Sequence, residues 1–232
     1  MPLHLGILAG LKSETRTLTN ANKAGALIEI SGARPTLAEA GAKRLIAAGC
    51  THLISYGIAG ALAPGLKAGQ LLLPEAVTGI SGDRFPVDKI WHRAAAGLLE
   101  TLNPMTGLIA WSDEAVSSVE GKAMLRSRTA ALAVDMESHW IAAAARAAGI
   151  PFLVIRAIAD EADQILPPAA LVGVTPSGDT NLIAVLASVV RYPAQIPALI
   201  RLGRAASAAH QTLQRCDLLG GSLGFGAVGF DP

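Results

Sequence analysis

The sequence alternates short apolar runs with segments of helical periodicity, and this alternation limits the folds open to the chain. The apolar runs are "LHLGILAG", "THLISYGIAG", "GQLLLPEAV", "TGLIAWSDEAV", "AALAVDM" and "PFLVIRAIAD". Most are continuously apolar, as in strands that are buried on both faces. Residues 35–49 and 138–151 carry helical periodicity and end at glycine or proline. The pattern predicts an α/β sandwich with a mainly parallel sheet.

Length and composition predict a single large core. The chain has 232 residues, of which 51% are hydrophobic, enough for one domain over residues 1–216. Residues 217–232 form a glycine-rich tail whose five glycines argue against a stable helix. Disorder of this tail and docking on a partner subunit both remain open.

Charge and cysteine usage disfavour several classes of function. The 19 basic and 18 acidic residues give a net charge of +1, so nothing in the balance favours nucleic acid as a partner. Cys50 and Cys216 have neither CxxC spacing nor a nearby histidine pattern, so we expect free buried thiols and no metal site. The first apolar run is too short for a membrane span and lacks the flanks of a signal peptide, so we expect a cytoplasmic protein.

Polar residues follow three predicted strands, and a glycine turn ends a fourth. Glu14 follows the first strand, Asp135 and Glu137 another, and Asp160 the last, while a glycine turn "GIAG" ends a fourth. Each cluster alone has an ordinary structural explanation, such as a helix cap or an Arg156–Asp160 ion pair. Ligands in parallel α/β folds gather at the carboxyl ends of strands, so together the clusters predict one site.

The segment "AVDMES", followed by "PFLVIRAIADEAD", resembles the purine nucleoside phosphorylase and methylthioadenosine/adenosylhomocysteine nucleosidase superfamily. Glu14 and the "GIAGAL" turn agree with it, and the resemblance covers residues 3–163. It implies a three-layer αβα sandwich with a mixed, mainly parallel central sheet. It also implies cleavage of the N-glycosidic bond of a purine nucleoside, by hydrolysis or phosphorolysis, with no cofactor other than phosphate as a co-substrate. Size and the segment "ILPPAALVGVTPSGDTN" look most like the hopanoid-associated phosphorylases, which act on the adenosine end of adenosylhopane.

The resemblance assigns roles to individual residues. Asp160 would protonate N7 of adenine, Glu137 would accept hydrogen bonds from the ribose hydroxyls, and Glu14 would activate a water molecule. Met136 would lie under the sugar. The remaining substrate-binding positions are Asp135, Arg156, Val116, Ala115, Ile58, Ala59 and Gly60. In a phosphorylase, Gly10, Lys12 and Arg34, together with Arg156, would hold phosphate.

Three positions depart from the family pattern. Ile58 stands where many relatives have a serine that helps hold phosphate or water. Ala159 replaces a serine that precedes the acid in adenosine nucleosidases, and Ala115 stands where relatives often stack an aromatic ring. The anion site, the orientation of Asp160 and the fit of the base pocket are therefore the open points of the resemblance.

The C-terminal part lies outside the shared motifs. From Thr180 to Cys216 there is no acidic residue, whereas Arg191, Arg201, Arg204 and Arg215 are basic. Either a solvated helical hairpin or peripheral contact with an anionic inner-membrane surface fits this pattern.

Three further expectations concern partners and rival functions. Relatives assemble as dimers or larger rings, so a homodimer is expected. A dinucleotide-binding oxidoreductase is disfavoured, because no predicted strand is followed by GxGxxG. A nucleoside-binding module without catalysis and a general methylthioadenosine/adenosylhomocysteine nucleosidase remain the alternatives.

Overall fold

The structure, a computed structural model, describes residues 4–171, 178–179 and 181–221. The elements in chain order are β1 (Leu5–Ala9), α1 (Lys12–Thr15), α2 (Thr19–Lys23), β2 (Leu27–Ile30), α3 (Pro35–Ala47), β3 (His52–Ala61), β4 (Leu71–Leu72), β5 (Ala76–Thr78), β6 (Arg84–Pro86), α4 (Lys89–Leu98), η1 (Glu100–Leu102), β7 (Leu108–Trp111), α5 (Val119–Thr129), β8 (Ala133–Asp135), α6 (Ser138–Ala148), β9 (Phe152–Asp160), α7 (Pro168–Leu171), α8 (Leu182–Arg191), η2 (Pro193–Gln195) and α9 (Ile196–Gly221).

One mixed sheet contains the strands, in the order β2-β1-β3-β8-β7-β5-β6, with β9 paired to both β3 and β4. The pairings β1–β2, β1–β3, β3–β9, β5–β7 and β7–β8 are parallel, and β3–β8, β4–β9 and β5–β6 are antiparallel. The α/β class with a mixed, mainly parallel sheet is thus confirmed. The long strands β3 and β9 form the centre of this sheet, and every side chain of β9 is buried.

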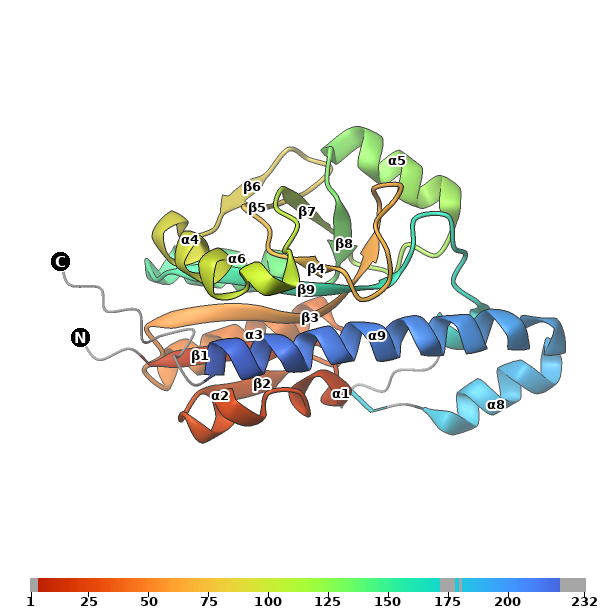
Figure 1. The fold of residues 1–232 in the computed structure, drawn as a ribbon, viewed down its shortest axis with the longest axis horizontal. Coiled ribbons are helices and arrows are strands. Elements are labelled where there is room, and N and C mark those ends of the chain that lie inside the picture. The colour runs from red at the N-terminus through yellow and green to blue at the C-terminus, as the bar shows by residue number, and fades with distance from the viewer. Residues whose placement is uncertain (1–3, 172–177, 180, 222–232) are drawn as a thin grey trace.

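Helices cover both faces of the central strands. α3 and α6 pack against each other over β1, β2 and β3, while α9 runs along β9 and contacts α1 and α2. Figure 1 shows α9 running along most of the length of the molecule, with α8 beside the N-terminal end of α9. Tyr56 on β3 fixes α9 in place, because its hydroxyl donates to the carbonyl of Leu213 at 2.8 Å. This packing holds the ends of β1, β3 and β9 in one region.

Two sequence expectations need correction. The run "GQLLLPEAV" forms two strands, β4 and β5, because Pro74 has no N–H with which to continue a ladder. α9 continues through Gly221, five residues past the expected domain boundary, so the predicted absence of a helix is wrong for residues 217–221. Asp217 explains the extension, since its buried carboxylate accepts hydrogen bonds from the backbone of Asn20 and Ala21 at the start of α2. The rest of the tail, residues 222–232, lies outside the described residues.

Other expectations concern the two cysteines and a membrane span. Cys50 and Cys216 are buried and free, as predicted. Among the described helices, none is both long and apolar enough to cross a membrane.

Candidate active site

A cavity of about 190 Å³ lies where β1, β3, β8 and β9 end. Most of the predicted site residues line it: Gly10, Glu14, Ile58, Ala59, Gly60, Ala115, Val116, Asp135, Met136, Glu137 and Asp160. Leu11, Ala33, Glu114, Val134, Ala159 and Leu166 complete the lining. The structure therefore brings together groups that are far apart in the chain, such as Glu14 and Asp160, which are 146 positions apart.

Arg156 lies behind this cavity as the centre of a buried cluster of charges. Its Nη2 lies 2.8 Å from Asp135 Oδ2 and 3.1 Å from Glu137 Oε2, and it donates to Ser55 Oγ at 2.7 Å. Ser138 donates both its hydroxyl and its backbone N–H to Asp135. Because Arg156 is only 1% exposed, this network fixes the two carboxylates on the wall of the cavity.

Glu14 lies beside this cluster, and two backbone N–H groups among the described residues donate hydrogen bonds to it. Its Oε2 accepts from the N–H of Leu11 at 2.8 Å, and its Oε1 accepts from the N–H of Ile58 at 2.9 Å. Burial raises the pKa of Glu14, while Arg156 and these two hydrogen bonds oppose the rise. Glu14 can thus exchange a proton nearer to neutral pH than an exposed glutamate.

Glycines allow the carboxylates to approach one another. A Cβ on Gly57 would lie 2.5 Å from both Glu14 Oε1 and Arg156 Nη1, and one on Gly10 would lie 2.8 Å from Glu137 Oε1. Gly57 also has a φ of +153°, which side chains rarely adopt. The glycine turn of the sequence therefore marks the place where Glu14 and Arg156 pack closely.

Three carboxyl groups surround the single guanidinium of Arg156. Burial raises the pKa of Glu137 to about 7; Arg156 opposes this rise, and Asp135 and Glu14 add to it. With Glu14 and Asp135 also present, the site carries more acidic groups than basic ones. Such a site stabilises positive charge that develops on a bound molecule, and it disfavours an anion.

Asp160 lines another part of the cavity, at the end of β9. Burial raises its pKa, and Lys122 opposes the rise. Lys122 Nζ lies 2.5 Å from Asp160 Oδ2, so the Arg156–Asp160 pair considered from the sequence does not form. Arg156 is occupied by Asp135 and Glu137 instead.

The residues predicted to hold phosphate do not converge. Lys12 makes an ion pair with Asp179 at 2.6 Å, and Arg34 is an exposed residue that precedes α3. Neither lines the cavity, and the guanidinium of Arg156 is bound to carboxylates. Gly10 is the one member of that predicted set at the cavity wall.

Sequence reasoning missed Lys122, Ser55 and Ser138. The signal for Lys122 was present, because it shares a face of α5 with the buried residues Leu125 and Thr129. Ser55 lies within the apolar strand β3 and Ser138 begins α6, and their hydroxyls are 2.9 Å apart, a pairing that no sequence spacing indicates.

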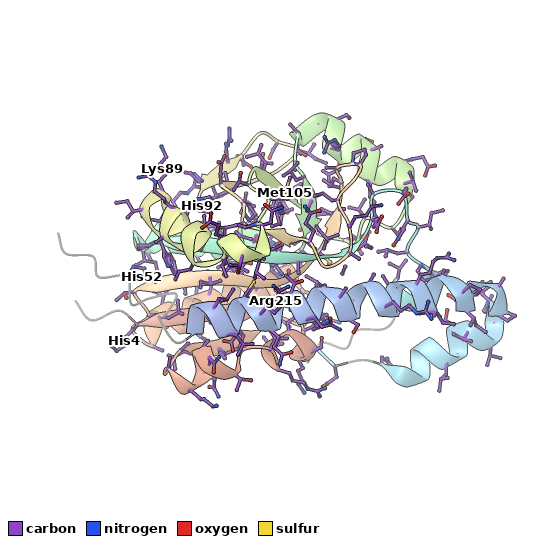
Figure 2. The ribbon with its side chains drawn as sticks, viewed as in Figure 1. His4, His52, Lys89, His92, Met105 and Arg215 are labelled. Atoms are coloured by element: carbon purple, nitrogen blue, oxygen red, sulfur yellow. The ribbon has the colours of Figure 1, made fainter. Side chains whose placement is uncertain are left out.

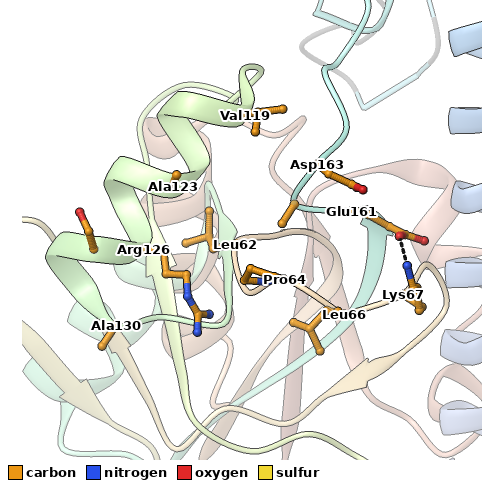
Figure 3. Close-up of a pocket in the computed structure, with 13 residues that line it drawn as sticks. Leu62, Pro64, Leu66, Lys67, Val119, Ala123, Arg126, Ala130, Glu161 and Asp163 are labelled. Atoms are coloured by element: carbon orange, nitrogen blue, oxygen red, sulfur yellow. Dashed lines mark hydrogen bonds and ion pairs between the residues drawn. The ribbon is translucent and has the colours of Figure 1, made fainter.

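A second cavity, of about 560 Å³, is lined on one side by residues of α5 (Figure 3). Leu62, Pro64, Leu66, Val119 and Ala123 form its apolar wall. Lys67 and Glu161 form an ion pair at 2.7 Å in this lining, and the lysine side chain is 70% exposed. Although larger, this cavity lacks the buried carboxylates of the first one.

The sequence gives no role to His92, His139 or His210, and two histidines, His52 and His92, lie away from the strand ends that carry the site. His52 begins β3, and His92 on α4 contacts the carbonyl of Leu73 at 3.0 Å. Figure 2 shows both on the side of the molecule away from α5. Neither lines the cavity that holds Glu14 and Asp160.

Comparison with known proteins places this geometry in context. Residues 14–191 match the phosphorylase superfamily. A Helicobacter pylori MTAN mutant with 5′-methylthioadenosine in the active site is similar to the chain at TM-score 0.67 and 18% identity, over 93% of this chain and 98% of that one. Futalosine hydrolase of the same organism matches at TM-score 0.67 and 18% identity, over 93% and 97% of the two chains. A 5′-methylthioadenosine/S-adenosylhomocysteine nucleosidase from S. pneumoniae matches at TM-score 0.66 and 21% identity, over 93% and 98%.

Proposed function

The chain belongs to the phosphorylase superfamily, and from that premise we propose that this enzyme hydrolyses the N-glycosidic bond of a 5′-substituted adenosine and releases adenine. The observation that supports it best is the convergence of Glu14, Glu137 and Asp160 on one cavity. Each carboxyl group has a pKa raised by burial. Acid–base catalysis at neutral pH needs such groups.

The three carboxyl groups match the three demands of the reaction. Asp160 holds a proton for N7, so that the purine leaves as a neutral base. Glu137 accepts hydrogen bonds from the ribose hydroxyls and stabilises the positive charge that develops on the sugar. Glu14 accepts a proton from the water molecule that attacks the anomeric carbon. Met136, which lines the same cavity, packs under the sugar.

Hydrolysis is favoured over phosphorolysis by the charges at the cavity. Lys12 and Arg34 do not line it, and Arg156 is bound to Asp135 and Glu137. Phosphate would therefore meet carboxylates with no free cation among the described lining residues to neutralise it. Water is the nucleophile that this site accommodates.

The 5′ substituent that we propose is a large apolar one, as in adenosylhopane. Leu166 lines both the site and a neighbouring groove of about 530 Å³. Ile165, Pro167, Pro168 and Leu202 supply apolar groups to that groove. Part of the segment on which the adenosylhopane assignment rests, residues 172–177 and 180, lies outside the described residues.

Membrane contact would bring such a substrate to the enzyme, and we propose it for the C-terminal helices. Leu186 and Val190 on α8 are 62% and 83% exposed, and Ile200 on α9 is 52% exposed, next to the exposed Arg201 and Arg204. Apolar and basic side chains together suit an anionic interface. Co-sedimentation with anionic vesicles that weakens as salt is added would support this contact, and no binding at low salt would contradict it.

The proposed activity is tested by measuring adenine release from adenosine and from adenosines with small and large apolar 5′ substituents, with and without phosphate. Release that does not depend on phosphate and is fastest with a large substituent is the expected result. A strict requirement for phosphate would overturn hydrolysis. A preference for methylthioadenosine would favour a general nucleosidase.

A further inference from the structure

Asp160 is paired with a lysine that lies outside the segments "AVDMES" and "PFLVIRAIADEAD". Lys122 on α5 places its ammonium nitrogen 2.5 Å from Asp160 Oδ2. No described residue donates a hydrogen bond to the other carboxyl oxygen, Oδ1. Gly60 lies opposite Asp160 on β3, so no side chain there fills the space beside the carboxyl group. One oxygen is therefore fixed by the protein, and the other is available to a ligand.

The surroundings of Lys122 fix its ammonium group. Its side chain is 1% exposed, and Nζ donates to three acceptors: Asp160 Oδ2, the carbonyl of Glu161 at 2.8 Å and the carbonyl of Gln164 at 2.9 Å. An ammonium group has three N–H donors, so all are used. Other residues of α5, among them Val119, Ala123 and Arg126, line the second cavity (Figure 3).

We propose that Lys122 is a positioning residue for adenine release: it orients the carboxyl group of Asp160 and stabilises the carboxylate that forms when the proton moves to the purine. This role rests on the proposed function. It also answers one departure from the family pattern, because Ala159 lacks the hydroxyl that would otherwise orient the acid, and Lys122 provides an alternative contact.

In the proposed step, the proton moves from Asp160 to the purine. The O–H bond of Asp160 breaks as an N7–H bond forms, and the electron pair of the C1′–N9 bond passes to the purine. Negative charge then lies on Asp160, 2.5 Å from Lys122 Nζ. A positive charge at that distance stabilises the carboxylate in a site that largely excludes water.

Burial and Lys122 act on the acid in opposite directions. Burial raises the pKa of Asp160, which keeps its proton available, whereas Lys122 limits the rise, which lets the proton leave. The neighbouring residue Glu161 pairs with Lys67, and Glu114, Asp135, Glu137 and Glu14 line the same cavity as Asp160. Lys122 is the cation that contacts the carboxyl group of Asp160 directly.

The test compares Lys122→Met with wild type over the pH range of activity. We expect kcat to fall about tenfold to a hundredfold. The limb on which activity falls with rising pH should move to higher pH, because Asp160 without Lys122 gives up its proton less readily. The control Lys43→Met removes an exposed ion pair with Glu39 at 2.6 Å. It should change neither kcat nor the pH range over which activity falls.

A double variant separates orientation from general stability. If Lys122 acts through Asp160, adding Lys122→Met to Asp160→Asn should not lower the residual rate further. Lys122→Arg, which keeps the charge, should leave the limb closer to wild type than Lys122→Met does. Two results would overturn the proposal. One is a Lys122→Met enzyme whose activity falls with rising pH over the same range as that of wild type. The other is a Lys122→Met change that lowers the rate equally in wild type and in Asp160→Asn.

Two outcomes remain distinct from failure of this inference. If wild type releases no adenine from any adenosine tested, the proposed function fails. If Lys122→Met does not fold, an NMR titration of the wild type that follows the carboxyl carbon of Asp160 and the ammonium nitrogen of Lys122 replaces the kinetic comparison. A Lys122 signal that shifts with the same midpoint as Asp160 supports contact between the charge and the acid, and a Lys122 signal that does not respond as Asp160 titrates contradicts it.

Discussion

The backbone N–H of Ile58 donates a hydrogen bond to Oε1 of Glu14 at 2.9 Å. Ile58 stands where many members of the family that the sequence resembles have a serine, so the sequence predicted that a polar contact is missing at this position. The contact that matters here comes from the main chain and needs no particular side chain. It orients the carboxylate that the proposed mechanism assigns to the attacking water.

Glu14→Gln tests that assignment. The amide keeps the shape of the side chain but cannot accept a proton from water, so adenine release should fall by about a hundredfold to ten-thousandfold. The measurement is kcat on the best adenosine substrate, with thermal unfolding as the check on folding. Near-wild-type kcat in the folded variant would remove Glu14 from the mechanism.

Stability should fall as the pH rises across the range set by Glu137. Its pKa is about 7 in the folded protein and 4.5 as the reference value. Between these values the native state keeps a proton that the unfolded chain has lost, so the native state is favoured at the acid end. The free energy of unfolding should drop by about 3 kcal/mol across this range.

Urea unfolding at a series of pH values measures this slope. Glu14 and Asp160 add a slope of the same sign, since burial raises both of their pKa values. Glu137→Gln should make the slope shallower without removing it. A stability that rises between pH about 5 and about 7 would contradict the buried-carboxyl account.

Gly57→Ala should damage both stability and activity. The new Cβ would lie 2.5 Å from Glu14 Oε1 and Arg156 Nη1 at a φ of +153°. A loss of about 1–3 kcal/mol in unfolding free energy is expected. Gly97→Ala in α4 is the matched control, because nothing lies within 4 Å of its Cβ, and it should be neutral or slightly stabilising. Equal effects of the two changes would rule out close packing at Gly57.

Asp217→Ala tests where the domain ends. Asp217 Oδ1 and Oδ2 accept from the backbone of Ala21 and Asn20, at 2.9 and 2.7 Å. Removal leaves buried donors unpaired, so unfolding should become easier by about 1–2 kcal/mol. Chemical denaturation measures the loss. An unchanged denaturation midpoint would indicate that residues 217–221 do not stabilise the domain and belong to the tail that the composition predicted.

The sequence predicted the fold class and most of the cavity lining because both depend on local patterns. Continuous apolar runs indicate buried strands, and acids at strand ends meet where strands converge. Pairing between distant residues left no such pattern. Lys122 on α5 pairs with Asp160, and Arg156 pairs with Asp135 and Glu137 and not with Asp160. Both sets of contacts depend on how separate elements pack together. The extension of α9 was hidden for the same reason, since Asp217 contacts a helix almost two hundred positions earlier.

Hydrolytic release of adenine is tested most directly by the sugar product formed in water enriched in heavy oxygen, with phosphate present. The account predicts a free 5′-substituted ribose that carries the heavy oxygen at its anomeric carbon, together with one adenine for each sugar. A ribose 1-phosphate without label at that carbon would contradict hydrolysis. Failure of well-folded protein to release adenine at all would instead indicate a nucleoside-binding protein without catalysis.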